Sequence, residues 1–268
     1  MSDSNSARAF RVLHQSGLLI LPNAWDAGSA RIIEHAGAKA IATSSAAVAW
    51  AHGYPDGEAV PPDALLATVR EIARVVRIPV SADIEAGYAP DAEAAGAFAA
   101  RVVAAGAVGV NIEDGTGAPE LLAAKIVRVK EAAAKAGVDL WINARVDVYL
   151  RQLETGEAAY EETVKRAQRY REAGADSIFV PGVAEAGLLS RLVREVVLPL
   201  NVLAWPGLPP AEKLKELGVR RLSAGSGIAR AVLNKVHSMA QAFLADARSE
   251  PLNEGVLTNQ ELNRLMRQ

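Results

Sequence analysis

Residues 80–113 read VSADIEAGYAPDAEAAGAFAARVVAAGAVGVNIE, and they show most clearly which elements alternate in this chain. A short apolar run over 80–85 leads into an alanine-rich segment over 91–105 and then into a second apolar run over 109–113. The two runs are too short for helices and fit buried strands, whereas the middle segment has the length of a helix that starts at Asp91. Gly106 follows it, where a helix end favours a residue with positive φ. The stretch therefore predicts a unit in which a helix connects two parallel strands.

The same unit recurs along the whole chain. Expected strands cover 18–23, 38–43, 80–85, 109–113, 140–145, 177–180, 200–204 and 221–224. Expected helices cover 26–36, 62–76, 91–105, 119–136, 157–173, 184–196, 209–217 and 228–247. Eight regular units, without a glycine-rich dinucleotide fingerprint after the first strand, favour a closed (β/α)8 TIM barrel over an open doubly wound sheet. We expect residues 1–248 to form the barrel and residues 249–268 to form a helical extension on the barrel or on a neighbouring subunit.

Length and composition exclude several classes of function. The 268 residues suit a single barrel, and they include no cysteine, which rules out disulfides, thiolate zinc sites and cysteine nucleophiles. The net charge is −2 and the 29 basic residues are spread along the chain, so no nucleic acid partner is expected. No apolar stretch reaches the roughly 18 residues of a membrane span, and the polar N-terminus is unlike a signal peptide. We therefore expect a cytoplasmic protein without membrane contact.

Carboxylates close two neighbouring strands at the barrel end where active sites lie. Asp83 and Glu85 alternate onto one face of the strand 80–85, and Glu113 closes the next strand. Buried carboxylates repel one another unless a cation lies among them, and hard oxygen ligands favour Mg²⁺ or Mn²⁺. The alternative is that these carboxylates cap helices or form ion pairs. Arg145 closes the strand 140–145 and suits a structural ion pair and a substrate carboxylate equally.

Two aromatic residues near the strand ends are further candidates. Tyr88 follows the Asp83–Glu85 segment and could line the pocket or donate a proton, the alternative being a packed position at the barrel rim. Trp205 follows the strand 200–204 and is a candidate for the pocket wall. The four histidines are assigned no role.

Six motifs together carry a resemblance to a known superfamily. They are PNAWDAGSARIIEHAGAKAI (22–41), TSSAAVAWAHGYPD (43–56), SADIEAGY (81–88), GVNIEDG (109–115), INARVD (142–147) and GVRRLSAG (218–225). From residue 19 to about residue 247 the sequence resembles the isocitrate lyase and phosphoenolpyruvate mutase superfamily.

The resemblance implies a Mg²⁺ site, a substrate site and an oligomer. Asp83 would bind the metal directly, with Asp56, Glu85 and Glu113 acting mainly through water. The substrate, a small 2-oxo acid, would lie on this metal and on Trp205, with its carboxylate held by Ser44, Ser45, Ala46 and Arg145; Ser44, Arg145 and Tyr88 are the catalytic candidates. Related proteins exchange their final helix between subunits, so a homo-oligomer, a dimer or a tetramer, is expected.

The sequence also departs from the pattern of the superfamily. The isocitrate and methylisocitrate lyases carry a Lys-Lys-Cys-Gly-His loop after the fourth strand, and the phosphonate enzymes carry a loop with Lys and Asn or Thr. Here residues 114–120 read DGTGAPE, with Thr116 but no matching Asn, and Pro181-Gly182 stands where relatives place His or Glu. These departures favour a reaction that needs only enolate stabilisation, namely decarboxylation or retro-aldol cleavage of a 2-oxo dicarboxylate. The alternatives are a phosphonopyruvate-type mutase or hydrolase, a Mg²⁺-dependent pyruvate aldolase, and a non-catalytic 2-oxo acid binding protein.

Overall fold

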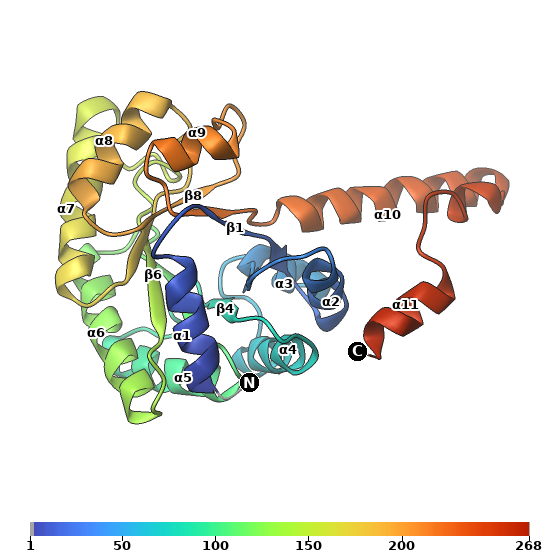
Figure 1. Cartoon of the computed structure of the whole chain (residues 1–268), viewed down its shortest axis with the longest axis horizontal. Coiled ribbons are helices and arrows are strands. Elements are labelled where there is room, and N and C mark those ends of the chain that lie inside the picture. The colour runs from blue at the N-terminus through green and yellow to red at the C-terminus, as the bar shows by residue number, and fades with distance from the viewer. Residues whose placement is uncertain (1–2, 268) are drawn as a thin grey trace.

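A computed structural model describes residues 3–267 (Figure 1). Nine parallel strands form one sheet in the order β1-β9-β8-β7-β6-β5-β4-β3-β2. β1 (Leu19–Leu21) and β2 (Asn23–Ala24) are two parts of one segment, interrupted at Pro22, which has no N–H to donate. β1 pairs with β9 (Arg221–Ser223), and β2 pairs with β3 (Ile41–Thr43). The sheet therefore returns on itself as a TIM-type barrel, which confirms the expected fold class.

The strand and helix order matches the expected alternation. The other strands are β4 (Val80–Asp83), β5 (Gly109–Glu113), β6 (Trp141–Arg145), β7 (Ser177–Phe179) and β8 (Leu200–Leu203). The helices around them are α2 (Ala27–His35), α4 (Pro62–Val75), α5 (Ala92–Ala104), α6 (Pro119–Lys135), α7 (Gly156–Glu172), α8 (Ala186–Val196) and α9 (Ala211–Glu216). Each expected element is present; the strand 109–113 has the expected bounds, and the ends of most others are shifted, because hydrophobic periodicity marks the interior of an element more sharply than its ends.

Local sequence signals explain where these helices begin and end. Asp26 and Asp91 precede α2 and α5, and each accepts a hydrogen bond from a backbone N–H of the first turn, on Ser29 and Ala94. The glycines expected after the helices all have positive φ in the structure, at positions 37, 106, 137, 174 and 218.

Two helices were not expected from the sequence. α1 (Asp3–Leu13) covers the barrel at the N-terminal ends of the strands, where the fully buried ring of Phe10 lies over Gly109. A Cβ on Gly109 would stand 2.6 Å from that ring, so this residue has to be glycine. α3 (Ser45–Ala51) follows β3 at the opposite end of the barrel and begins at Ser44, whose hydroxyl accepts a hydrogen bond from the backbone N–H of Ala47.

The C-terminal part of the chain extends away from the barrel (Figure 1). α10 (Gly227–Asp246) projects as an arm, and the chain returns through a short 3₁₀ turn, η1 (Glu250–Leu252), to α11 (Asn259–Met266). Leu265 of α11 is buried, and its carbonyl oxygen accepts hydrogen bonds from Nε and Nη2 of Arg31 on α2, at 3.1 and 2.8 Å. The extension thus packs on the first barrel helix of its own chain.

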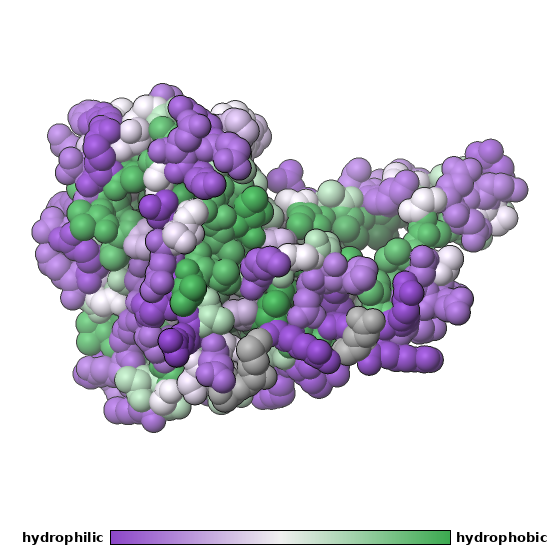
Figure 2. Space-filling model, in the orientation of Figure 1, coloured by the Kyte–Doolittle hydropathy of each residue, from purple (hydrophilic) through white to green (hydrophobic). Residues whose placement is uncertain are grey.

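The α10 arm leaves apolar side chains exposed (Figure 2). The most exposed of them is Leu244, at 85%, and the others with more than two fifths of their surface exposed are Val232, Leu233, Val236 and Phe243. No helix within residues 3–267 is long and apolar enough to cross a membrane.

Candidate active site

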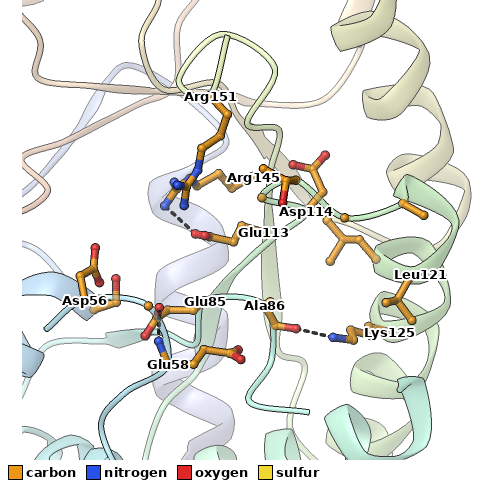
Figure 3. A pocket seen from close by; sticks show the side chains of 17 residues that line it. Asp56, Glu58, Glu85, Ala86, Glu113, Asp114, Leu121, Lys125, Arg145 and Arg151 are labelled. Carbon is orange, nitrogen blue, oxygen red and sulfur yellow. Dashed lines mark hydrogen bonds and ion pairs between the residues drawn. The ribbon is translucent and has the colours of Figure 1, made fainter. Parts of the chain in front are cut away.

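A cavity of about 350 Å³ opens at the carboxyl ends of β4, β5 and β6 (Figure 3). This volume lies within the range of sites for small organic ligands. The acidic residues that line it are Asp56, Glu58, Glu85, Glu113 and Asp114, and the basic ones are Lys125, Arg145 and Arg151. Ser45 and the glycine-rich segment 115–118 complete the rim. The cavity therefore has the location of a TIM-barrel active site and an excess of negative charge.

Asp83 is a buried carboxylate that does not itself line the cavity but contacts the lining residue Ser45. Its backbone N–H donates to the Thr43 hydroxyl at 2.8 Å, and its Oδ2 accepts a hydrogen bond from the backbone N–H of Ser45 at 3.0 Å. Burial raises the pKa of Asp83, although Arg145 opposes the shift. Because Ser45 is the first residue of α3, the expected substrate-binding residues Ser44, Ser45 and Ala46 are brought next to Asp83.

The expected alternation of Asp83 and Glu85 on one strand is wrong. β4 ends at Asp83, and Glu85 has a left-handed backbone with φ of 49°. The turn nevertheless directs the Glu85 carboxylate into the cavity, where it accepts hydrogen bonds from the Glu58 backbone N–H at 2.7 Å and the Tyr88 hydroxyl at 3.0 Å. Burial raises the pKa of Glu85 to about 7, and the nearby charges of Asp83 and Asp56 add to the increase.

The turn that carries Glu85 is held from two sides. The Glu58 carboxylate accepts a hydrogen bond from the Tyr88 backbone N–H at 2.7 Å, and Glu58 and Tyr88 also have positive φ. From α6, the Lys125 ammonium donates to the carbonyl oxygens of Ala86 and Ala89, both at 2.7 Å. Left-handed non-glycine residues cost free energy and persist where neighbouring contacts hold them. The position of Glu85 therefore depends on Glu58 and Lys125.

Arg145 lies opposite Glu113 in the register of β5 and β6, and the two side chains form an ion pair at 2.5 Å. Its Nε and Nη2 donate to the two carboxylate oxygens of Asp147, at 2.6 and 3.0 Å. Burial raises the pKa of Glu113 to about 8, and this outweighs the opposing attraction of Arg145. Arg145 is thus locked in structural ion pairs while it also lines the cavity.

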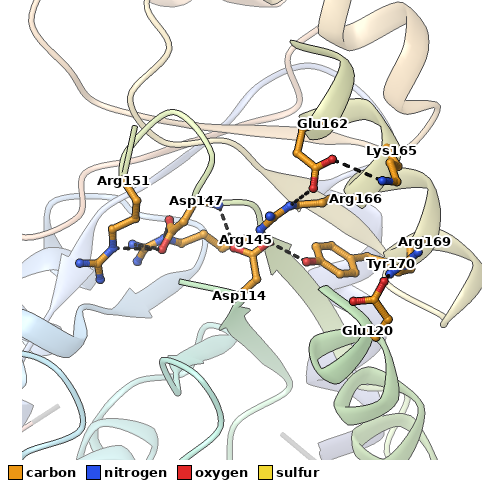
Figure 4. Close-up of polar contacts among 10 residues, drawn as sticks. All are labelled: Asp114, Glu120, Arg145, Asp147, Arg151, Glu162, Lys165, Arg166, Arg169 and Tyr170. Carbon is orange, nitrogen blue, oxygen red and sulfur yellow. Dashed lines mark hydrogen bonds and ion pairs between the residues drawn. The ribbon is translucent and has the colours of Figure 1, made fainter. Parts of the chain in front are cut away.

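Asp114 supports Arg145 from behind (Figure 4). It is buried and accepts hydrogen bonds from the Tyr170 hydroxyl at 2.6 Å, from Arg166 at 3.0 Å and from the backbone N–H of Asp147 at 2.9 Å. Because Asp147 in turn orients Arg145, this network fixes the guanidinium at the cavity.

Five expected site residues lie outside the cavity lining, namely Ser44, Ala46, Asp83, Tyr88 and Trp205. Trp205 is 42% exposed, and the Tyr88 ring stacks on Phe98 with 5.2 Å between the ring centres. Burial and the neighbouring Glu85 raise the pKa of Tyr88, so its hydroxyl keeps its proton.

Sequence reasoning missed Glu58, Lys125 and Arg151. Lys125 could have been recognised from the sequence, because it lies among the buried residues Leu122, Ile126 and Val129 on the apolar face of α6. A charged side chain is unusual on such a face and indicates a specific partner. Glu58 and Arg151 lie in irregular segments, 53–59 and 147–155, that have no periodic pattern and already contain other charged residues, so neither residue stood out.

The donor chemistry fits a divalent cation. No group of three or more His, Asp or Glu side chains within residues 3–267 is arranged to hold a metal by itself. Glu85 and Glu113 nevertheless line the cavity, Asp83 is hydrogen-bonded to the lining residue Ser45, and burial raises the pKa of all three. A cation among them would offset the cost of burying these charges, and Mg²⁺ suits such a site because it keeps several waters and needs few protein ligands.

The sequence model of the phosphoenolpyruvate phosphomutase family matches residues 10–244. The chain belongs to the phosphoenolpyruvate mutase family. Among its relatives, an uncharacterized protein of Mycobacterium tuberculosis is 40% identical over 224 residues, which cover 81% of this chain and 82% of the relative. An oxaloacetate decarboxylase of Pseudomonas entomophila is 31% identical over 222 residues, which cover 79% of this chain and 75% of the relative.

Solved structures of the phosphoenolpyruvate mutase family have the same fold. A putative lyase/mutase from Burkholderia cenocepacia is 32% identical, with a TM-score of 0.89 over 98% of this chain and 95% of that chain. A phosphonopyruvate hydrolase in complex with oxalate and Mg²⁺ is 25% identical, with a TM-score of 0.86 over 97% of this chain and 94% of that chain. The superfamily resemblance inferred from the sequence is confirmed.

Proposed function

We propose that the chain is a Mg²⁺-dependent lyase that decarboxylates, or cleaves by a retro-aldol step, a small 2-oxo dicarboxylate through an enolate. The observation that carries this proposal is the contrast between the acidic cavity and the loop beside it. Glu85 and Glu113 line the cavity, and Asp83 accepts a hydrogen bond from its lining residue Ser45, so three carboxylates are available near a cation. By contrast, Thr116 is the only polar side chain of the segment 115–118. The site is thus equipped to stabilise negative charge, and its loop offers no general acid.

Asp83, with Glu85, Glu113 and Asp56 around it, would hold the Mg²⁺. When bound, the ion supplies Lewis-acid stabilisation of the negative charge that develops on the 2-oxo oxygen. The relative from Pseudomonas entomophila, an oxaloacetate decarboxylase, and the phosphonopyruvate hydrolase solved with oxalate and Mg²⁺ support this assignment.

The chain's own residues would bind and orient the substrate. Arg145, held in place by Asp147, would bind the carboxylate next to the 2-oxo group together with Ser44, Ser45 and Ala46 at the start of α3. In decarboxylation, the electron pair of the broken C–C bond passes into the carbonyl group as CO₂ leaves, so bond cleavage itself requires no proton transfer. A retro-aldol step requires a base that removes a hydroxyl proton. Decarboxylation therefore makes the smaller demand on this site.

A substrate panel tests the proposal. Oxaloacetate, 2-oxoglutarate and phosphonopyruvate are each incubated with the protein and Mg²⁺, while product formation and the shift in melting temperature are measured. Mg²⁺-dependent release of pyruvate from oxaloacetate supports the proposal. Turnover of phosphonopyruvate alone would indicate a mutase or hydrolase, and stabilisation without any turnover would indicate a binding protein; either result contradicts it.

A further inference from the structure

Three positively charged side chains line the cavity, and two of them are already held by strong contacts to other residues of the chain. The ammonium of Lys125 donates to two backbone carbonyl oxygens at 2.7 Å. Arg145 donates to both carboxylate oxygens of Asp147 and pairs with Glu113 at 2.5 Å. Both groups contribute positive charge, but neither can turn toward a second anionic group of a ligand without giving up these contacts.

Arg151 differs from the other two. Its side chain is 50% exposed, and within residues 3–267 its one ionic contact is to Asp147, with 3.7 Å between Nε and Oδ2. Because Asp147 already accepts two short hydrogen bonds from Arg145, it holds Arg151 only weakly. The Arg151 side chain donates no hydrogen bond to any residue in this part of the chain, so its planar set of donors is available at the cavity (Figure 3).

The charge of the cavity gives this free guanidinium a role. A 2-oxo dicarboxylate brings two negative groups into a cavity already lined by five acidic side chains. Arg145 and the cation site at Asp83 would account for the 2-oxo acid end. The second carboxylate would be repelled by its surroundings unless another cation met it, and a guanidinium meets a carboxylate through two parallel hydrogen bonds.

We infer that Arg151 binds the distal carboxylate of the substrate and thereby selects 2-oxo dicarboxylates over 2-oxo monocarboxylates. The inference rests on the proposed function and specifies the substrate class of the same site. The same donors would also accept the oxygens of a phosphonyl group, so the test has to separate the two kinds of anion.

Two matched pairs of ligands isolate the distal group. Oxaloacetate is pyruvate with one added carboxylate, and 2-oxoglutarate is 2-oxobutanoate with one added carboxylate. Wild type, Arg151→Met and Arg151→Lys are compared in the presence of Mg²⁺. Calorimetry measures the binding of 2-oxoglutarate and of 2-oxobutanoate. For the other pair, kinetics give the KM for oxaloacetate and the inhibition constant of pyruvate. Arg74→Met, which removes an equally positive exposed side chain from α4, is the matched control.

Arg151→Met is expected to weaken binding of both dicarboxylates about 10- to 100-fold, the loss typical of hydrogen bonds to a charged group. Binding of both monocarboxylates should change by less than about twofold, Arg151→Lys should recover part of the affinity because it keeps the charge, and Arg74→Met should resemble wild type. Equal losses for mono- and dicarboxylates, or no loss for either, would overturn the inference.

The two proposals fail in different ways. If wild type does not turn over oxaloacetate but prefers 2-oxoglutarate to 2-oxobutanoate in an Arg151-dependent manner, the proposed reaction is wrong and the role of Arg151 stands. Tighter binding of phosphonopyruvate than of oxaloacetate, lost in Arg151→Met, would overturn the assignment of a carboxylate as the distal group.

Discussion

At the residue scale, His14 links the stability of the barrel to pH. Its ring lies under the barrel, stacked on Trp141 at 4.1 Å, and its Nδ1 is hydrogen-bonded to the Phe10 carbonyl oxygen at 2.9 Å. Burial, together with the positive charge of Arg221, lowers the pKa of His14 to about 3. The folded protein therefore keeps His14 neutral at pH values where the unfolded chain, with a pKa near about 6.5, takes up a proton.

The sign of the effect follows from this difference in pKa. The contribution of His14 is complete above about pH 6.5 and is lost progressively as the pH falls toward 3. As the pH falls from 7 to 5.5, protonation of His14 in the unfolded chain should lower the free energy of unfolding by about 1 kcal/mol. Urea denaturation at both pH values measures the loss for wild type and for His14→Phe, which keeps the aromatic contact. The variant should lose about 1 kcal/mol less, and equal losses would show that His14 is not held neutral.

The residues that were predictable from the sequence are those that close strands. Asp83, Glu113 and Arg145 follow apolar runs, and the parallel register brings them to one end of the barrel. Strand alternation was the predicted reason for Glu85 to face the cavity. In the structure, a turn with a left-handed backbone at Glu85 directs its side chain there instead. Arg151 and Glu58 were not predictable, since their roles depend on loop conformations that have no periodic signal.

At the scale of elements, the contact of α6 with the turn 85–89 holds Glu85 in position. Lys125→Met removes both hydrogen bonds to the carbonyl oxygens of that turn, which should cost about 1–3 kcal/mol of stability. It should also lower kcat/KM about tenfold or more, because small displacements of a positioned group are costly. Activity and urea denaturation are measured together.

A second lysine of α6 provides the control. Lys130 donates to the Leu140 carbonyl oxygen and pairs with Asp176, away from the cavity. Lys130→Met should lower stability while leaving kcat/KM within about twofold of wild type, since it supports no residue of the cavity. If the two variants lose activity to the same extent, the contact between Lys125 and the turn is structural only.

The alternation of helices and strands was predictable because each element has its own period and its own end signals. α1 and α3 were not, since α1 is polar and precedes the first strand, and α3 follows a strand where a loop is usual. α1 matters for the core because Phe10 fills the space over Gly109, a contact between residues 99 positions apart that no local pattern reveals.

At the scale of the whole molecule, the α10 arm leaves the barrel incompletely covered. Ile20 on the outer face of β1 is 57% exposed, in a groove lined by the end of α1, the segment 36–39 after α2, and α9. The apolar side chains of α10 lie on the projecting arm instead (Figure 2). We propose that the arm of a second copy covers this groove, giving the expected dimer or tetramer.

The arm can be tested by the mass of the particle in solution. Wild type should sediment as a dimer or tetramer, and Val236→Glu combined with Leu244→Glu should shift it toward monomer, because both side chains would be buried in the interface. Gln241→Glu adds negative charge at an exposed polar position of the same helix and should leave the oligomer intact. A monomeric wild-type protein, or an oligomer unaffected by the double substitution, would refute the proposed contact.

In the proposed function, a cation held by Asp83 makes this chain a lyase. The most direct test measures pyruvate formed from oxaloacetate with Mg²⁺, corrected for the reaction without protein, for wild type, Asp83→Asn and Asp139→Asn. Asp139 lies on the surface in an ion pair with Arg11 and serves as the control. We expect Mg²⁺-dependent turnover by wild type and by Asp139→Asn, and a loss of about 100-fold or more in Asp83→Asn. Turnover that persists in Asp83→Asn, or that does not require Mg²⁺, would contradict the account.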